Sequence, residues 1–200
     1  MSSWALVPVK AGGAGKQRLT QRLTLGQRTR LIRVMLAEVL AALAQSPRID
    51  GVAVLSADGD GVPAGVDVLG DAGFGLNASL EGGLRQLHAR GATRVTILFA
   101  DLPLVTAEDV TLLVAAADAA DLAIAPDHTG TGTNALTLPL PTAFRLQFGP
   151  GSFARHLREA EALGSRVQAV RRAGLAFDID EPDDIAALQA RNDPRYAFLA

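Results

Sequence analysis

The sequence has 200 residues, enough for one domain of ordinary size, and its 19 basic and 21 acidic residues give a formal net charge of -2. Because the basic residues are scattered, we expect no nucleic-acid partner. The absence of cysteine excludes disulfides and thiolate chemistry, and no apolar run reaches the ~20 residues of a membrane span, so we expect a cytoplasmic protein that binds small molecules and no membrane.

Short apolar runs alternate along the chain with longer segments of helical period. The run at 94–100 is apolar on both faces, which predicts a central strand. In chain order, the pattern predicts a strand at 4–9, a helix at 28–44, strands at 52–55 and 66–69, a helix at 78–90, a strand at 94–100, a helix at 107–119, strands at 122–125 and 134–140, a helix at 152–163, a strand at 166–170 and a helix at 182–189.

This alternation favours a three-layer α/β fold, with a mostly parallel central sheet and helices on both faces. The chain has no linker, repeat or low-complexity stretch, so residues 1–200 are expected to form a single domain. In open α/β sheets the ligand lies beyond the C-terminal ends of the strands. The loops after the predicted strands are therefore the places to look for a site.

The loop after the first strand combines glycines with the cations Lys10, Lys16 and Arg18. Glycines let backbone amides approach an anion, and the cations add positive charge. The loop is not a P-loop, because Gln17 stands where that motif has Ser or Thr. An ordinary flexible surface loop with solvated cations explains the same residues.

A second glycine-rich loop, at 70–77, precedes the second predicted helix, at 78–90. Gly73 and Gly75 would let a flat ligand such as a nucleobase come close to the backbone, and Asn77 could donate and accept hydrogen bonds at its edge. On spacing alone, a turn with Asn77 as helix N-cap is the favoured interpretation.

Three carboxylates follow predicted strands or turns. Asp101 comes directly after the central strand, and its hard oxygens suit Mg²⁺, although Asp in such a turn often bonds its own backbone. Asp178 and Asp180 are two residues apart, so in extended chain they point the same way and can share one cation.

Glycines and hydroxyls also occur together at 130–134 and at 148–153. Ser152 stands at an expected helix start, where backbone amides can bind a phosphate. Ordinary turn and cap chemistry explains either segment alone. His88, His128 and His156 are isolated from one another, which disfavours a zinc site.

In this order, the motifs resemble those of the 2-phospholactate and phosphoenolpyruvate guanylyltransferases of coenzyme F420 biosynthesis, which have the nucleotide-diphospho-sugar transferase fold. The resemblance runs from Pro8 to Asp184. One departure is the Ala-Gly-Gly-Ala-Gly sequence at 11–15, where the family has a proline and bulkier residues; it puts the rigidity of this loop in doubt. The most specific elements are the segments 100–103, 130–133, 148–152 and 178–184.

The resemblance implies a transfer of GMP from GTP to a phosphorylated C3 acid (phosphoenolpyruvate, 2-phospholactate or 3-phosphoglycerate) with release of pyrophosphate. It implies a role for each candidate residue: Lys10, Lys16, Arg18 and Asp101 in catalysis at the triphosphate; Asp101, Asp178 and Asp180 as Mg²⁺ ligands; Thr133, Gly149 and Ser152 on the acid; and Gly73, Gly75 and Asn77 near the base.

Two alternatives stay open at this point. One is another nucleotidyltransferase of the same fold, such as a molybdopterin guanylyltransferase or a sugar-phosphate enzyme. The other is a catalytically silent nucleotide-binding module. The sequence fixes neither the acid nor the oligomeric state, and a homodimer is compatible with it.

Overall fold

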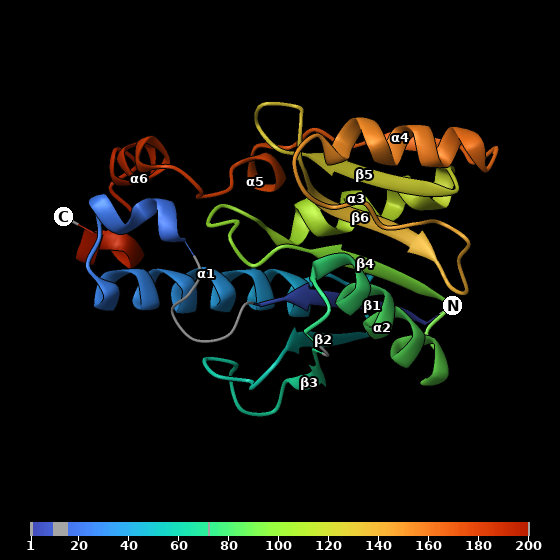
Figure 1. Ribbon diagram of the computed structural model, residues 1–200, viewed down its shortest axis with the longest axis horizontal. Helices are drawn as coiled ribbons and strands as arrows, with labels where there is room; N and C mark the ends of the chain where they lie inside the picture. Colours follow the sequence, from blue (N-terminus) through green and yellow to red (C-terminus); the bar gives the residue numbers. More distant parts are fainter. Residues whose placement is uncertain (1, 10–15, 72, 200) are drawn as a thin grey trace.

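The computed structural model describes residues 2–9, 16–71 and 73–199. Its centre is a seven-stranded sheet with the order β3-β2-β1-β4-β6-β5-β7 (Figure 1). The strand β6 runs antiparallel to both of its neighbours, and the other strand pairs are parallel. The strands are β1 (Ser3–Pro8), β2 (Gly51–Ser56), β3 (Asp67–Gly70), β4 (Arg94–Leu98), β5 (Leu122–Pro126), β6 (Thr133–Pro139) and β7 (Val167–Ala169).

Helices fill the segments between most strands. Of these, α3 and α6 have the predicted ends, whereas η1, α5 and η2 were not predicted because each is too short to show a helical period. No helix in the described ranges is both long and apolar enough to span a membrane. The helices are α1 (Leu25–Gln45), α2 (Leu76–Ala89), α3 (Ala107–Ala119), α4 (Ser152–Ala162), α5 (Ala173–Ala176) and α6 (Pro182–Gln189), and the 3-10 helices are η1 (Gln17–Gln21) and η2 (Pro194–Leu199).

Alternate side chains of β1 pack on opposite faces of the sheet, as the pleat of a strand requires. Ala5 and Val7 pack in a core with α1 and α3, whereas Leu6 packs in a second core with α2 and α4. The three-layer α/β prediction is therefore confirmed. A third core joins η1, α1, α6 and η2, which gather at one end of the molecule (Figure 1).

The reversed direction of β6 decides where the candidate residues meet. Because β6 is antiparallel to β4, its first residues lie where β4 ends. The backbone N–H of Phe99, just after β4, donates to the carbonyl of Asn134 at 3.1 Å. The start of β6 and the loop after β4 therefore share the sheet edge at which β1, β2 and β3 also end.

Candidate active site

Lys16 lies between two carboxylates at this edge. Its Nζ is 2.5 Å from Asp101 Oδ2 and 2.8 Å from Asp180 Oδ1, and its side chain is only 10% exposed. Burial alone would lower the pKa of Lys16, but the charges of Asp101 and Asp180 and their hydrogen bonds outweigh it and raise the pKa to about 12. Lys16 therefore carries a fixed positive charge at this position.

Asp178 is the third carboxylate of the group. The backbone N–H of Ile179 donates to the carbonyl of Asp101 at 3.2 Å, which aligns the two segments. Burial raises the pKa of Asp178 above its usual range, and the charges of Asp101 and Asp180 add to the effect. A hydrogen bond from Asn134 Nδ2, at 3.3 Å, acts in the opposite direction. The three carboxylates thus come close enough to influence one another.

Hard carboxylate oxygens are the protein ligands that Mg²⁺ prefers. In the structure, however, Asp101 and Asp180 both contact the Lys16 ammonium. Among the described residues, no three His, Cys, Asp or Glu side chains lie close enough together to form a metal site. Magnesium binding by Asp101, Asp178 and Asp180 therefore stays a prediction.

The residues expected at the acid lie around the N-terminus of α4. Thr133 is buried at the start of β6. The N–H of Ser152 donates to the Gly149 carbonyl at 3.0 Å, and the N–H of Phe153 donates to the Thr131 carbonyl at 3.0 Å. Ser152 is the first residue of α4 and not its N-cap, which is Gly151 without a side-chain bond.

Sequence reasoning missed Asp127, which shapes the loop before β6. Its carboxylate accepts hydrogen bonds from Thr129 Oγ1 and from the N–H groups of Thr131 and Gly132, all at 2.9 Å. Burial would raise its pKa, but these bonds outweigh it and lower the pKa below the usual range. The Asp-x-Thr-Gly-Thr-Gly sequence is the signal that could have indicated this turn.

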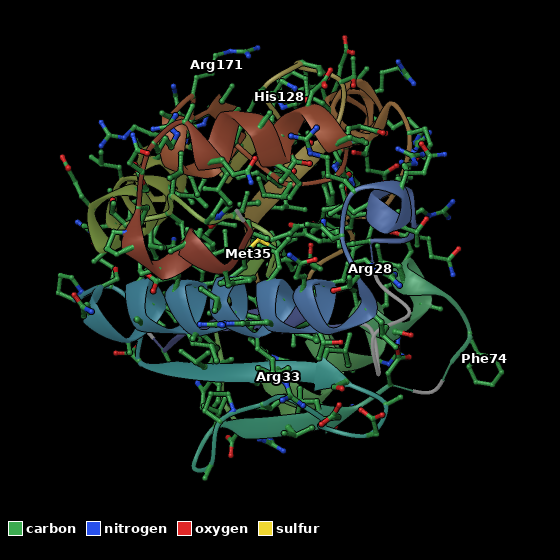
Figure 2. The ribbon with its side chains drawn as sticks, turned by 90° about the vertical axis from the view of Figure 1, so that its left-hand side faces the viewer. Arg28, Arg33, Met35, Phe74, His128 and Arg171 are labelled. Carbon is green, nitrogen blue, oxygen red and sulfur yellow. The ribbon has the colours of Figure 1, made fainter. Side chains whose placement is uncertain are left out.

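The glycine-rich loop after β3 projects from the body of the molecule. Gly73 and Gly75 have positive φ values of 76° and 94°, and Phe74 between them is 84% exposed (Figure 2). Gly75 is the N-cap of α2, so the N-cap interpretation of Asn77 does not hold. Instead, Asn77 bonds the Phe148 backbone twice, at 3.1 Å to its carbonyl and 2.8 Å from its N–H.

The other two cations predicted at the triphosphate are Lys10 and Arg18. Lys10 lies outside the described residues. Arg18, in η1, is exposed and pairs with Glu181 at 2.6 Å between Nη1 and Oε1. Arg18 is therefore placed at the rim of the carboxylate group.

The sequence analysis gave no role to two further polar residues: Asn134, at the end of the segment 130–134, and His156, which it considered only as a zinc ligand. Asn134 Nδ2 donates to the Leu175 carbonyl at 3.1 Å as well as to Asp178, so it links β6 to the carboxylate group. His156, on the buried side of α4, contacts Thr133. Only the folded chain brings these residues to the site.

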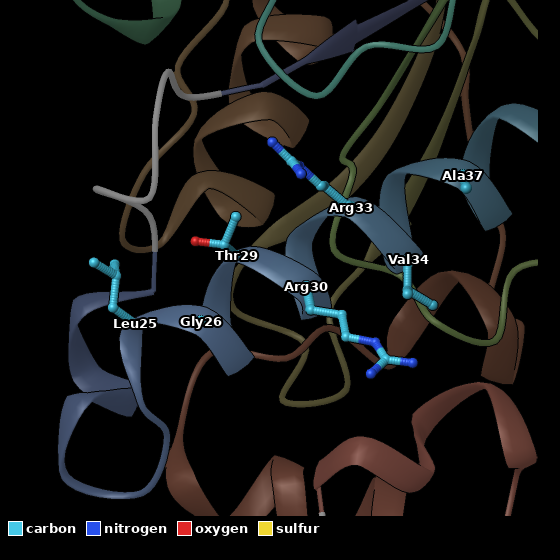
Figure 3. A pocket seen from close by; sticks show the side chains of 7 residues that line it. All are labelled: Leu25, Gly26, Thr29, Arg30, Arg33, Val34 and Ala37. Atoms are coloured by element: carbon cyan, nitrogen blue, oxygen red, sulfur yellow. The ribbon is translucent and has the colours of Figure 1, made fainter.

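A groove of about 740 Å³ runs along α1 (Figure 3). Its two cations are already engaged: the Arg30 guanidinium lies 4.3 Å from the Phe198 ring centroid, and Arg33 pairs with Asp60 at 3.4 Å. None of its lining residues belongs to the candidate site; they are Leu25, Gly26, Thr29, Arg30, Arg33, Val34 and Ala37.

Comparisons with known proteins identify the family of the chain. The family model described as "Guanylyl transferase CofC like" matches residues 3–197. The chain is 41% identical to the phosphoenolpyruvate guanylyltransferase of Rubrobacter xylanophilus, over 98% of both chains. It is 37% identical to the 2-phospho-L-lactate guanylyltransferase of Halorubrum lacusprofundi, over 86% of this chain and 78% of that protein.

A solved structure with a similar fold is a provisionally named nucleotide-diphospho-sugar transferase from Desulfovibrio desulfuricans. Its TM-score is 0.79 at 17% identity, covering 100% of this chain and 94% of that one. At this identity the similarity shows the fold alone.

Proposed function

Because the chain belongs to the family of CofC-like guanylyl transferases, we propose that it transfers GMP from GTP to a phosphorylated C3 acid and releases pyrophosphate, within coenzyme F420 biosynthesis. The observation that carries the proposal is the group of three carboxylates and Lys16, which adjoins the start of β6. Such a group suits a triphosphate and its cation. Relatives named for phosphoenolpyruvate and for 2-phospho-L-lactate make these two acids the first candidates, with 3-phosphoglycerate a third.

The reaction needs little covalent help from the protein. A phosphate oxygen of the acid attacks the α-phosphorus of GTP, the new P–O bond forms, and the bond to the β,γ-pyrophosphate breaks. With a second pKa of about 6, a phosphate monoester is already an anionic nucleophile near neutral pH. The protein's tasks are therefore positioning and charge neutralisation.

Each part of the site supplies one of these tasks. Lys16 holds a positive charge toward the triphosphate, assisted by Arg18 at the rim and by Lys10. Asp101, Asp178 and Asp180 would hold Mg²⁺, which supplies further charge neutralisation when bound.

The acid is assigned to the N-terminus of α4. There Thr133 and Ser152 offer hydroxyl donors, and the positive φ of Gly149, 123°, suits a tight backbone turn beside the anion. The amides at the start of an 11-residue helix add a favourable dipole.

The guanine base is assigned to the loop at Gly73 and Gly75. Both amide atoms of Asn77 already bond the Phe148 backbone, so the backbone of this loop, more than the Asn77 side chain, is available to the base. In this proposal Asn77 holds the base loop (residues 73–75) against the acid loop (residues 147–151).

Incubation with GTP, Mg²⁺ and each of the three acids tests the function, with pyrophosphate release and product mass as the readouts. We expect a GMP-acid diphosphate from at least one acid. Pyrophosphate release with a sugar phosphate, and with none of the acids, would overturn the assignment. Sedimentation of the purified protein tests the homodimer that we include in the proposal.

Ser152→Ala tests the acid site. Losing one hydrogen bond to an anion costs about 1.5–3 kcal/mol, so we expect the KM for the acid to rise roughly ten- to hundredfold while the KM for GTP changes little. The matched control is Thr24→Ala, because Thr24 caps α1 with a full capping box. This control should lose about 1 kcal/mol of stability and keep its KM values.

A further inference from the structure

His156 is a fully buried polar side chain without a role in the proposed reaction. It is 1% exposed and lies against the rings of Phe144 and Phe148, at centroid distances of 5.7 and 4.8 Å. Burial, assisted by the charge of Arg155, lowers its pKa to about 4. The imidazole is therefore neutral at neutral pH and carries one proton.

The backbone decides which nitrogen carries that proton. The N–H of Gln147 donates to His156 Nε2 at 3.0 Å. A backbone N–H can only donate, so Nε2 must offer a lone pair and the proton lies on Nδ1. Because Nδ1 is 3.1 Å from Thr133 Oγ1, the imidazole donates and the Thr133 hydroxyl accepts.

This direction has a consequence for the Thr133 hydroxyl. A hydroxyl has one proton, and while it accepts from His156 its own proton is free for another acceptor. An ionised phosphate or carboxylate is an acceptor only. With the reverse direction, the Thr133 proton would be spent on the imidazole and its lone pairs would face the anion.

We propose that His156 is a positioning residue that turns the Thr133 hydroxyl into an obligatory donor for the anionic group of the acid. The inference rests on the proposed function, which places the acid at Thr133. Gln147, whose N–H sets the tautomer, precedes Phe148 in the loop before α4. Asn77 accepts a hydrogen bond from the N–H of Phe148 and so holds this loop in place. The tautomer is thus set by the same loop that borders the acid.

A purely structural pair would satisfy two buried polar groups and do no more. Both interpretations predict some loss of stability when either residue is changed. They differ in whether His156 affects the KM for the acid, and in whether that effect depends on the Thr133 hydroxyl. A double-mutant cycle measures this dependence.

The cycle comprises Thr133→Val, His156→Gln and the double variant, assayed with phosphoenolpyruvate or whichever acid the protein uses. His156→Gln keeps an acceptor for the Gln147 N–H and loses the donor at Nδ1. We expect the KM for the acid to rise about tenfold in this variant, with the KM for GTP within about twofold. The double variant should be no worse than Thr133→Val alone. His156→Asn, whose amide can still donate to Thr133, should recover most of the affinity.

The outcomes separate the two proposals. If Thr133→Val weakens acid binding and His156→Gln does not, or if their effects simply add, the positioning role is overturned and the acid site stands. If Thr133→Val leaves the KM unchanged, the acid does not bind at Thr133, and the acid-site part of the proposed function fails as well.

The tautomer of His156 can also be measured directly in the wild-type protein, so this test does not depend on the folding of a variant. The ¹⁵N chemical shifts of the labelled imidazole distinguish the two neutral tautomers. We expect the proton of His156 on Nδ1 at pH 7, and a proton on Nε2 would overturn the proposal.

Discussion

Lys16 is buried beside two carboxylates, and the two influences on its pKa act in opposite directions. Desolvation disfavours the ammonium, whereas Asp101 and Asp180 favour it, and the pKa of about 12 shows that the carboxylates prevail. Among the described residues, Asp178 pairs with no lysine or arginine, and His128 Nδ1 lies 3.6 Å from its Oδ1. Burial raises the pKa of Asp178, and the charges of Asp101 and Asp180 raise it further.

Asp101→Asn removes one partner of Lys16 and one predicted Mg²⁺ ligand. We expect kcat to fall by about two orders of magnitude or more, of the size seen when one electrostatic group of an active site is lost, with only a small change in melting temperature. Asp118→Asn is the matched control, because Asp118 also contacts two cations, Arg48 and Arg94, but lies outside the site. Full activity of the Asp101 variant would remove this residue from the mechanism.

His156 makes stability depend on pH. Its folded pKa, about 4, is below the unfolded value of about 6.5, so between these values the unfolded state binds more protons and stability falls as the pH falls. From pH 7 to pH 5 we expect a loss of about 2 kcal/mol from this residue. The charged groups nearest to it are Arg155, which donates to the Gln147 carbonyl, and Glu159, which accepts from the Gln147 side chain.

Urea unfolding at both pH values checks this, in the wild type and in His156→Gln. The variant should lose about 2 kcal/mol less than the wild type on acidification. Equal losses in the two proteins would show that His156 titrates normally in the folded state.

At the scale of an element, the Asp127 carboxylate holds the loop from 127 to 132 by hydrogen bonds. This arrangement requires a glycine at position 132. A Cβ at Gly132 would lie 2.6 Å from Asp127 Oδ2 and 3.2 Å from its Cγ. The Asp127 carboxylate would have to move, and it would lose bonds to the loop amides. The loop leads directly into Thr133, so a shift here reaches the acid site.

Gly132→Ala should therefore lower stability by about 1–3 kcal/mol, the cost of leaving such groups unpaired, and should raise the KM for the acid more than that for GTP. Gly82→Ala is the control: its nearest neighbour is Arg85 Nη2 at 3.8 Å, inside α2. There alanine should stabilise the helix by up to about 1 kcal/mol. Thermal unfolding and steady-state kinetics on both variants provide the measurement, and unchanged kinetics in Gly132→Ala would separate this loop from the acid site.

At the scale of the whole molecule, one sheet edge gathers the loops after β1, β3 and β4 and the start of β6. Hydrogen bonds connect the three predicted parts of the site: Asn134 links Asp178 to β6, His156 links Thr133 to α4, and Asn77 links the loop after β3 to Phe148. The nucleotide and the acid can therefore be bound by neighbouring segments.

A further prediction concerns the choice of nucleotide. We expect GTP to be used in preference to ATP, CTP and UTP, chiefly because the chain belongs to the guanylyl transferase family. The loop at Gly73 and Gly75 offers backbone groups to a purine edge, although these groups could serve any base. Initial rates with each nucleotide at equal concentration test this. Comparable rates with ATP and GTP would reject guanine selectivity and leave nucleotidyl transfer intact.

The sequence by itself determined most of the elements. Strand and helix alternation is a local property, because the period of apolar residues reports which side of each segment is buried, and the predicted central strand is indeed β4, the fourth of seven. Asp101 and the pair Asp178 and Asp180 could be singled out because each follows a strand or stands in a short polar turn. The family could be recognised because its motifs are short and local too.

Only the tertiary structure decided how those residues meet. The contacts of Lys16 join residues 85 and 164 positions apart in the chain, and they depend on the order of the strands, which no local period encodes. The antiparallel direction of β6 places Thr133 and Asn134 at the edge where β4 ends. The same packing turns His156, isolated in the sequence, toward Thr133. Such contacts arise from which apolar faces are buried together, and this is settled only when the whole chain folds.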